Sequence, residues 1–193
     1  ALEIDNQPGT FGQNGNNRLS DTASITLNRG VLIARGSDDA RSDENTGSIV
    51  FNSAYNTITL DADEIATNTL GLAGDIRLTA NNLIRLNRAT GLVRGDRLGV
   101  DLADGAGVTN LGQSQVVLDS VTDGTNLLSH AQTTPGTTDL GVIPWLTGGS
   151  TAADGGSTLV TYDPNFGFRP LDINTEFSNQ VFSATGKIGR AHV

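Results

Sequence analysis

The side chains best suited to chemistry are three carboxylates, Asp61, Asp63 and Glu64, which follow the end of an apolar segment. Carboxylate oxygens bind calcium, and paired carboxylates with an arginine nearby can act as acid and base on an acidic polysaccharide. Arg85 and Arg88 would lie one repeat away. Because alternating carboxylates after a strand also simply solvate a turn, we predict no catalytic residue and no cofactor, and retain these three as candidate calcium ligands.

Other motifs give less support for catalysis. A serine nucleophile needs a base, and His130 is the only histidine before the last six residues. No Gly-x-Ser-x-Gly segment is present to expose a nucleophile. The tripeptide Arg94-Gly95-Asp96 matches one that animal adhesion receptors recognise, and we interpret it as a coincidence within a repeat. The sequence therefore predicts that the chain is not an enzyme.

Composition narrows the possible partners. The 193 residues carry a formal charge of -9 with 21 acidic residues, and such a surface repels phosphate backbones, which argues against nucleic acid. The sequence contains no cysteine, so it offers neither a disulfide framework nor a thiolate metal site. No apolar run approaches the ~18 residues of a membrane span, so we expect no membrane insertion by this segment.

A short pattern of two apolar residues around one spacer recurs through the first half of the chain. It occupies residues 2–4, 25–27, 49–51, 58–60, 76–78 and 84–86. Alternation with a period of two places both apolar side chains on one face of a strand. These segments are therefore expected to be strands.

The spacing of these segments predicts the architecture. Two interleaved series appear, one of Ile25, Ile49 and Ile76 and the other of Ile33, Ile58 and Ile84, with Leu2 expected to open the first. Within each series the copies lie 24 to 27 residues apart. A repeat of roughly 20 to 30 residues that contains short strands is typical of a solenoid. We predict an all-β fold, a parallel β-helix.

Polar residues mark the ends of several of these strands. Asn28, Asn52 and Asn87 each follow an apolar strand end, and Asp61 takes the same place after Leu60. Asparagine tolerates left-handed backbone, and stacked asparagine side chains can bond from coil to coil. We therefore expect an asparagine ladder along one corner of the fold.

The amino-acid composition of the chain changes at two places. Residues 37–47 are rich in Asp, Ser and Glu and are expected to form an exposed loop. We expect residues 1–120 to form the coils, and residues 121–187, rich in Gly, Ser and Thr, to be a less regular continuation or end. Trp145 is expected to anchor packing at an open coil edge rather than to stack on a sugar.

An ordered set of short motifs resembles bacterial autotransporter-associated β-strand repeat proteins. The set comprises residues 17–23, 25–30, 46–51, 56–59, 93–99, 143–145, 160–163 and 167–171, beginning Asn17-Arg18-Leu19-Ser20-Asp21. The resemblance implies a right-handed parallel β-helix in a secreted or cell-surface, outer-membrane-associated passenger. It also implies further repeats and a membrane barrel elsewhere in the full-length protein, and no catalytic residues.

The two ends of the sequence point to a fragment. Ile188 to Val193 reads as the translation of a common sequencing adapter, so we expect residues 188–193 to be an artefact, with the protein cut at both ends.

The sequence leaves three functions open. The first is a structural or adhesive spacer that presents loops to a polysaccharide or protein ligand. The second is a β-helical polysaccharide lyase or hydrolase that uses Asp61, Asp63 and Glu64. The third is a carbohydrate-binding module that uses Trp145 or Tyr162.

Overall fold

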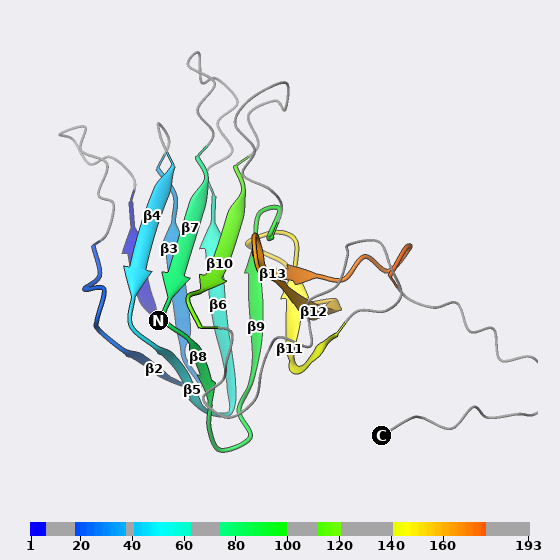
Figure 1. The fold of residues 1–193 in the computed structure, drawn as a ribbon, viewed down its shortest axis with the longest axis horizontal. Helices are drawn as coiled ribbons and strands as arrows, with labels where there is room; N and C mark the ends of the chain where they lie inside the picture. Colours follow the sequence, from blue (N-terminus) through cyan, green and yellow to red (C-terminus); the bar gives the residue numbers. More distant parts are fainter. Residues whose placement is uncertain (7–17, 38–40, 63–73, 100–111, 121–140, 177–193) are drawn as a thin grey trace, which may run out of the picture.

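The computed structural model describes residues 1–6, 18–37, 41–62, 74–99, 112–120 and 141–176 (Figure 1). These residues form strands and turns without a helix, so the predicted all-β class is confirmed. Sheet A contains, in order, β1 (Leu2–Asp5), β3 (Val31–Arg35), β6 (Tyr55–Asp61), β9 (Thr90–Gly95), β11 (Ile143–Gly149), β12 (Thr158–Asp163) and β13 (Gly167–Pro170). Sheet B contains β2 (Ile25–Asn28), β5 (Ile49–Ser53) and β8 (Leu83–Arg85), and sheet C contains β4 (Ser42–Thr46), β7 (Ile76–Ala80) and β10 (Ser114–Leu118).

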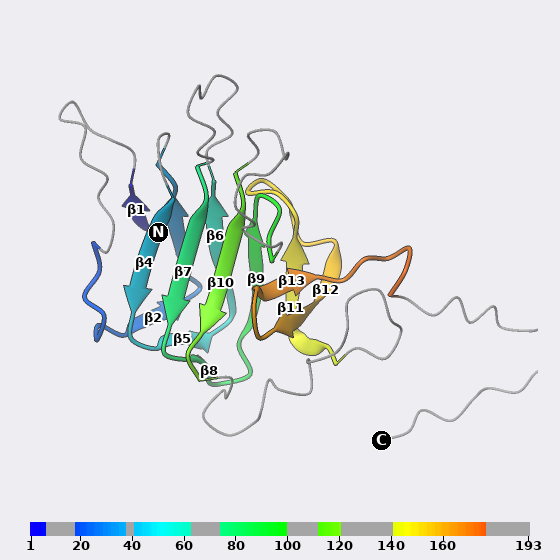
Figure 2. The same ribbon diagram turned by 45° about the horizontal axis from the view of Figure 1, so that its top comes forward.

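From β2 to β10 the chain passes three times through the sheets in the same order, B then A then C. The first pass is β2, β3 and β4, the second β5, β6 and β7, and the third β8, β9 and β10. Every strand of a pass pairs in parallel with the matching strand of the pass before it. We call these three passes the stack; Figures 1 and 2 show its strands side by side within each sheet.

The core lies between the three sheets and is built from side chains in register. Leu32, Ile58 and Val93 occupy one row of sheet A and are almost completely buried. Ile76 and Leu78 point inward from sheet C, and Ile49 and Phe51 from sheet B. Burying each large side chain is worth roughly 1.5 to 3 kcal/mol. Neighbouring passes therefore bury one another's apolar residues.

The register confirms one of the sequence pairings and corrects the others. Ile25 pairs with Ile49, as predicted. Ile49 pairs next with Leu83 rather than Ile76, because Ile76 belongs to sheet C. Ile58 was predicted to pair with Ile33 and Ile84, but it pairs with Leu32 and Val93. Leu2 was predicted to pair with Ile25, but it pairs with Leu32. The prediction was wrong because two strand series were assumed where each pass has three strands.

The third strand of the first pass was missed because its inward face is polar. Residues 37–47 were predicted to be an exposed loop, yet Ser42–Thr46 is strand β4, and Ser42, Glu44 and Thr46 are buried. One Glu44 carboxylate oxygen accepts hydrogen bonds from the Arg18 N–H (2.8 Å) and the Leu19 N–H (3.3 Å). These backbone donors satisfy one oxygen of the buried carboxylate and so lower the cost of placing a glutamate on the inward face. Asp38 and Asp39 lie outside the described residues.

The predicted asparagine ladder is present between sheets B and A. The Asn52 amide donates to the Asn28 side-chain oxygen (2.7 Å), and the Asn87 amide donates to the Asn52 oxygen (3.0 Å). The left-handed backbone predicted for these residues occurs only at Asn87 (φ 46°); in the other two turns it falls on Arg29 and Ala54. Asn28 and Asn52 are therefore used for their side-chain bonds.

Asn52→Ala is expected to lower the free energy of unfolding by about 1 kcal/mol, because the variant loses one donor and one acceptor at a partly exposed site. Chemical denaturation in urea measures the difference. Asp21→Ala, at an exposed position, is the control and should stay within about 0.5 kcal/mol of the parent. Equal effects in the two variants would contradict a stabilising ladder.

The last three strands leave the repeating order. β11 is parallel to β9, but β12 and β13 are antiparallel to their neighbours and form a hairpin, and β13 also contacts β10 of sheet C. Trp145 on β11 is 8% exposed and meets the Phe51 ring edge-on, with ring centroids 6.2 Å apart. The predicted packing role of Trp145 is therefore confirmed.

Candidate functional site

The carboxylates singled out from the sequence are only partly described. Asp61 ends β6 and forms an ion pair with the Arg35 guanidinium, whose Nε lies 2.6 Å from a Glu3 carboxylate oxygen. The hydrogen bond that Arg35 donates to the Glu3 carboxylate is the main cause that raises the pKa of Arg35 above its usual value. Asp63 and Glu64 lie outside the described residues, so the structure does not show whether the three carboxylates meet. Asp61 itself belongs to a row of ion pairs across β1, β3 and β6.

The arginines expected beside this cluster have other contacts. Arg85 occupies a position aligned with Phe51 on sheet B, donates from Nε to the Ala89 carbonyl (2.7 Å) and lies 5.5 Å from the centre of the Trp145 ring. Arg88 adopts left-handed backbone in the turn that follows β8 (φ 56°). The Arg85 guanidinium therefore contributes to the packing around Trp145 through a cation–π contact.

Metal binding finds no support in the described ranges. Among residues 1–6, 18–37, 41–62, 74–99, 112–120 and 141–176, no three His, Cys, Asp or Glu side chains come together in a way that could hold a metal ion. No helix in that part of the chain is long and apolar enough to cross a membrane. The candidate histidine, His130, lies outside it.

The Arg94-Gly95-Asp96 tripeptide is bonded into the fold. Arg94 donates to the Thr59 hydroxyl (2.9 Å) and to the Asp154 carbonyl (2.9 Å). The Asp96 carboxylate accepts from the N–H groups of Ala62 (3.1 Å) and Ala152 (3.0 Å). Both charged side chains that a receptor would need therefore make contacts within the protein.

The two aromatic residues considered for sugar binding are buried. Trp145 is 8% exposed and Tyr162 is 1% exposed. Tyr55, in contrast, is 46% exposed on β6, and its hydroxyl lies 3.5 Å from the Thr147 hydroxyl. Thr147 lines an open hollow of about 310 Å³ together with Ser157 and Leu159. Sequence reasoning missed Tyr55 because the predicted strand covers only residues 58–60, whereas β6 extends back to Tyr55.

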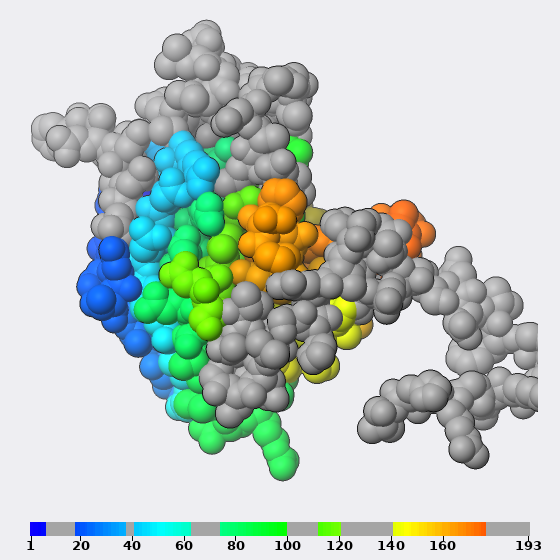
Figure 3. All heavy atoms as spheres, in the orientation of Figure 1, coloured from blue at the N-terminus to red at the C-terminus, as the bar shows by residue number. Residues whose placement is uncertain are grey.

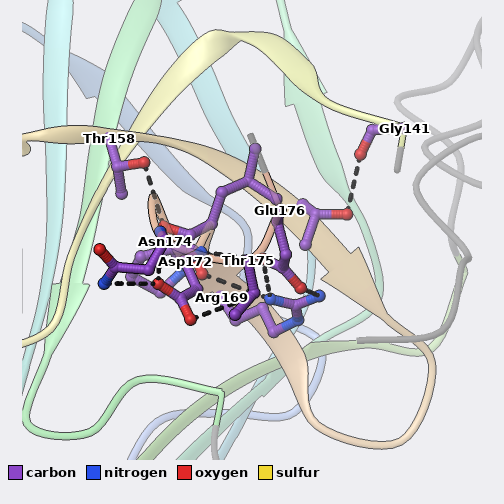
Figure 4. A network of polar contacts seen from close by, with 10 residues as sticks. Gly141, Thr158, Arg169, Asp172, Asn174, Thr175 and Glu176 are labelled. Atoms are coloured by element: carbon purple, nitrogen blue, oxygen red, sulfur yellow. Dashed lines mark hydrogen bonds and ion pairs between the residues drawn. The ribbon is translucent and has the colours of Figure 1, made fainter. Parts of the chain in front are cut away.

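A second polar group closes the end of the β12–β13 hairpin. Arg169 binds Glu176 through two parallel bonds of 2.7 and 2.8 Å, and Glu176 also accepts from the Asp172 N–H (2.8 Å; Figure 4). Hydrogen bonds from the Asn174 N–H and then the Thr175 hydroxyl lower the pKa of Asp172. This network holds the segment after β13 against the hairpin. The carboxylates of Asp172 and Glu176 both accept hydrogen bonds within it, so the network is structural rather than a pair of carboxylates that faces a substrate.

Asp75, just before β7, is a partly buried carboxyl whose titration should be visible in the stability of the protein. Burial raises its pKa above the ordinary 3.8, although a bond from the Gln113 N–H (2.9 Å) and the charges of Arg41 and Arg97 oppose the shift. The folded state therefore holds this proton more tightly than the unfolded state. Its contribution to stability is complete below pH 3.8 and is lost as the pH rises through the folded pKa.

Asp75→Asn is expected to become more favourable relative to the parent as the pH rises, because asparagine keeps an acceptor for the Gln113 N–H and does not ionise. The difference in unfolding free energy, variant minus parent, should be larger at neutral pH than in acid. Urea denaturation across that range measures it. A difference that does not change with pH would contradict the raised pKa.

Comparison with known proteins gives no relative: no family model, no curated protein and no solved structure matches this chain.

Proposed function

We propose that this chain is a segment of a right-handed parallel β-helix, and that it acts as a spacer or stalk in a secreted or cell-surface bacterial protein. The observation that carries the proposal is the threefold passage through sheets B, A and C in one order, with each strand parallel to its counterpart. A structure of this kind lengthens by adding passes, and its stability comes from contacts between neighbours. The resemblance to autotransporter-associated repeats supports the surface location.

The contacts suit a load-bearing role. Each pass is joined to the next by backbone bonds in three sheets, and two side-chain rows reinforce them. One row is the ladder of Asn28, Asn52 and Asn87, and the other is the ion-pair row of Glu3, Arg35 and Asp61. Separating two neighbouring passes breaks the backbone bonds of three sheets and an asparagine bond together, so the stack resists peeling along its length.

Presentation of loops follows from the strand directions. β1, β3, β6 and β9 are parallel neighbours, so their carboxyl ends lie along one edge of sheet A. The connection from β6 to β7 and that from β9 to β10 both begin at this edge. Segments inserted there would meet a polysaccharide or protein ligand side by side.

Pulling the chain from its two ends by single-molecule force spectroscopy tests the spacer function. We expect successive force peaks as passes detach, with released lengths of roughly 80 and 120 Å for segments of 24 and 35 residues. Ile58→Ala, which leaves a cavity in the second pass, should lower the force of one peak and leave the released lengths unchanged. Extension without force peaks would contradict a load-bearing stack.

A second candidate function, carbohydrate binding, is favoured by one observation: Tyr55 exposes its ring beside the hollow that Thr147 lines. An exposed aromatic face with neighbouring hydroxyls suits a sugar ring. Affinity electrophoresis in gels that contain neutral or acidic polysaccharide tests it. Retardation that Tyr55→Ala abolishes and Tyr55→Phe retains would support binding, and equal mobility in every gel would exclude it for those polysaccharides.

The lyase or hydrolase alternative has less support. Asp61 would have to leave its ion pair with Arg35 before it could serve as an acid, a base or a metal ligand.

A further inference from the structure

We propose that the β12–β13 hairpin ends the stack: it occupies the free edge of β10 and so prevents a second copy of this chain from adding its N-terminal end there. The inference rests on strand pairing, so it does not depend on the spacer function. Open strand edges recruit further strands, and proteins commonly cover them.

The edge in question is defined by the alternation of backbone groups along β10. The Asp119 N–H donates to the Ala80 carbonyl and the Gln113 carbonyl accepts from the Ile76 N–H, so the odd-numbered residues face β7. In a parallel strand, alternate residues bond to opposite sides. Ser114, Val116 and Leu118 therefore direct their N–H and carbonyl groups to the other side, where the next parallel strand would pair.

Groups from other parts of the chain lie against each of these three residues. The Gly99 N–H donates to the Ser114 carbonyl (2.9 Å). The Tyr162 hydroxyl accepts from the Leu118 N–H (2.8 Å) and donates to the Leu118 carbonyl (3.3 Å). Burial raises the pKa of Tyr162, so the hydroxyl keeps the proton that it donates.

Between these two contacts the hairpin approaches the strand closely. Gly167 sits against the Val116 carbonyl, and a Cβ added to Gly167 would lie 2.0 Å from that oxygen. Gly167 also has a φ of 81°, which L side chains rarely adopt. Glycine is therefore required at this position for the hairpin to cover the edge.

The hairpin is held in this place by its own contacts. Tyr162 and Phe168 pack edge-to-face with ring centroids 5.0 Å apart, and Arg169 binds Glu176 on the following segment. In Figure 3 the orange hairpin surface lies directly beside the light green surface of β10. The cover is thus an ordered part of the fold.

A second copy of this chain fits the uncovered edge. At the opposite end of the stack β1, β2 and β4 are the first strands of their sheets and, in the described ranges, pair with a strand on one side only. All three are parallel to their neighbours, as an added pass would be. Such head-to-tail contacts do not close, so they would extend into filaments.

Two variants of the full chain test the proposal by analytical ultracentrifugation over a wide concentration range. Gly167→Val displaces the hairpin because the added side chain clashes with the Val116 carbonyl. Tyr162→Phe keeps the ring but removes the hydroxyl that bonds to the Leu118 N–H and carbonyl. We expect the parent to stay monomeric. In at least one variant the average mass should roughly double or more as the concentration rises.

Thr26→Pro in β2 supplies the matched control, because an added pass would pair its β2 with β8 of sheet B while its β4 pairs with β10 of sheet C. The Ile25 N–H bonds to the Ser48 carbonyl of the next pass, so the Thr26 N–H points to the outer edge, where proline would block pairing. Added to either variant, Thr26→Pro should restore the monomer. Monomers at every concentration in both hairpin variants would overturn the proposal, and so would association that Thr26→Pro leaves unchanged.

Discussion

Arg169→Ala is expected to lower the free energy of unfolding by about 3 to 5 kcal/mol. The Glu176 side chain is 1% exposed, and its two oxygens bind the Arg169 guanidinium at 2.7 and 2.8 Å. Removing the arginine leaves a buried carboxylate without its counter-charge, which is the costly way to break such a pair. Urea denaturation measures the loss.

The position of the pair in the fold explains why its loss should be seen globally. Arg169 lies on β13, and Glu176 ends the segment that folds back onto it. Without the pair, Glu176 no longer holds the turn at Asp172 against β13, and the β12–β13 hairpin loses its contact with the segment that follows it (Figure 4).

Two controls separate charge burial from simple loss of contact. Arg35→Ala breaks the ion pairs with Glu3 and Asp61, but this arginine is 39% exposed, so the change should cost no more than about 1 kcal/mol. The double change Arg169→Met with Glu176→Leu removes both charges and should recover most of the stability that Arg169→Ala loses. If the double variant is as unstable as Arg169→Ala, the buried charge is not the cause.

Phe51→Ala is the second large expectation, again a loss of about 3 to 5 kcal/mol. Phe51 is fully buried on β5, and its ring meets the edge of Trp145, which joins sheet B to β11 of sheet A. The cavity would open between the second pass and the C-terminal strands. Trp145 fluorescence, followed through a urea titration, reports both the stability and the changed surroundings of the indole.

Gly91 provides a matched test of the same contact. A Cβ on Gly91 would lie 2.2 Å from the Phe51 ring, so Gly91→Ala alone should cost roughly 1 to 3 kcal/mol by overpacking. In a Phe51→Ala background the ring is gone and the added methyl should cost much less. Additive losses in the double variant would contradict direct contact between the two residues.

The parts of the fold that the sequence predicts are those where the inward face is aliphatic. Ile25 and Ile49 were paired correctly because in both strands buried apolar residues alternate with more exposed ones. The asparagine ladder was predictable for a related reason, since Asn28 and Asn52 directly follow such strands.

The parts that could not be predicted depend on partners distant in sequence. β4 turns Glu44 inward, and the donors to one of its carboxylate oxygens are the backbone N–H groups of Arg18 and Leu19, 26 and 25 residues away. Arg85 likewise occupies a core-facing register position because Trp145 covers it. Neither environment is visible in a local pattern of polar and apolar residues.

The candidate site shows the same limit. Trp145 was correctly assigned to packing, whereas Tyr55 was missed because β6 begins at Tyr55, three residues before the segment 58–60 that the pattern predicts as strand.

The unequal spacing of the asparagine ladder bears on how such a chain can change during evolution. Asn28 and Asn52 are 24 residues apart and Asn52 and Asn87 are 35 apart, yet both bonds form. Much of the extra length lies between the end of β6 at Asp61 and the start of β7 at Ile76. Doubling the length of a connection between two strands costs only about 0.6 kcal/mol in closure entropy. The connection between β6 and β7 should therefore accept inserted peptides without disturbing the strands. The fold is in this respect a scaffold on which sequences can diversify.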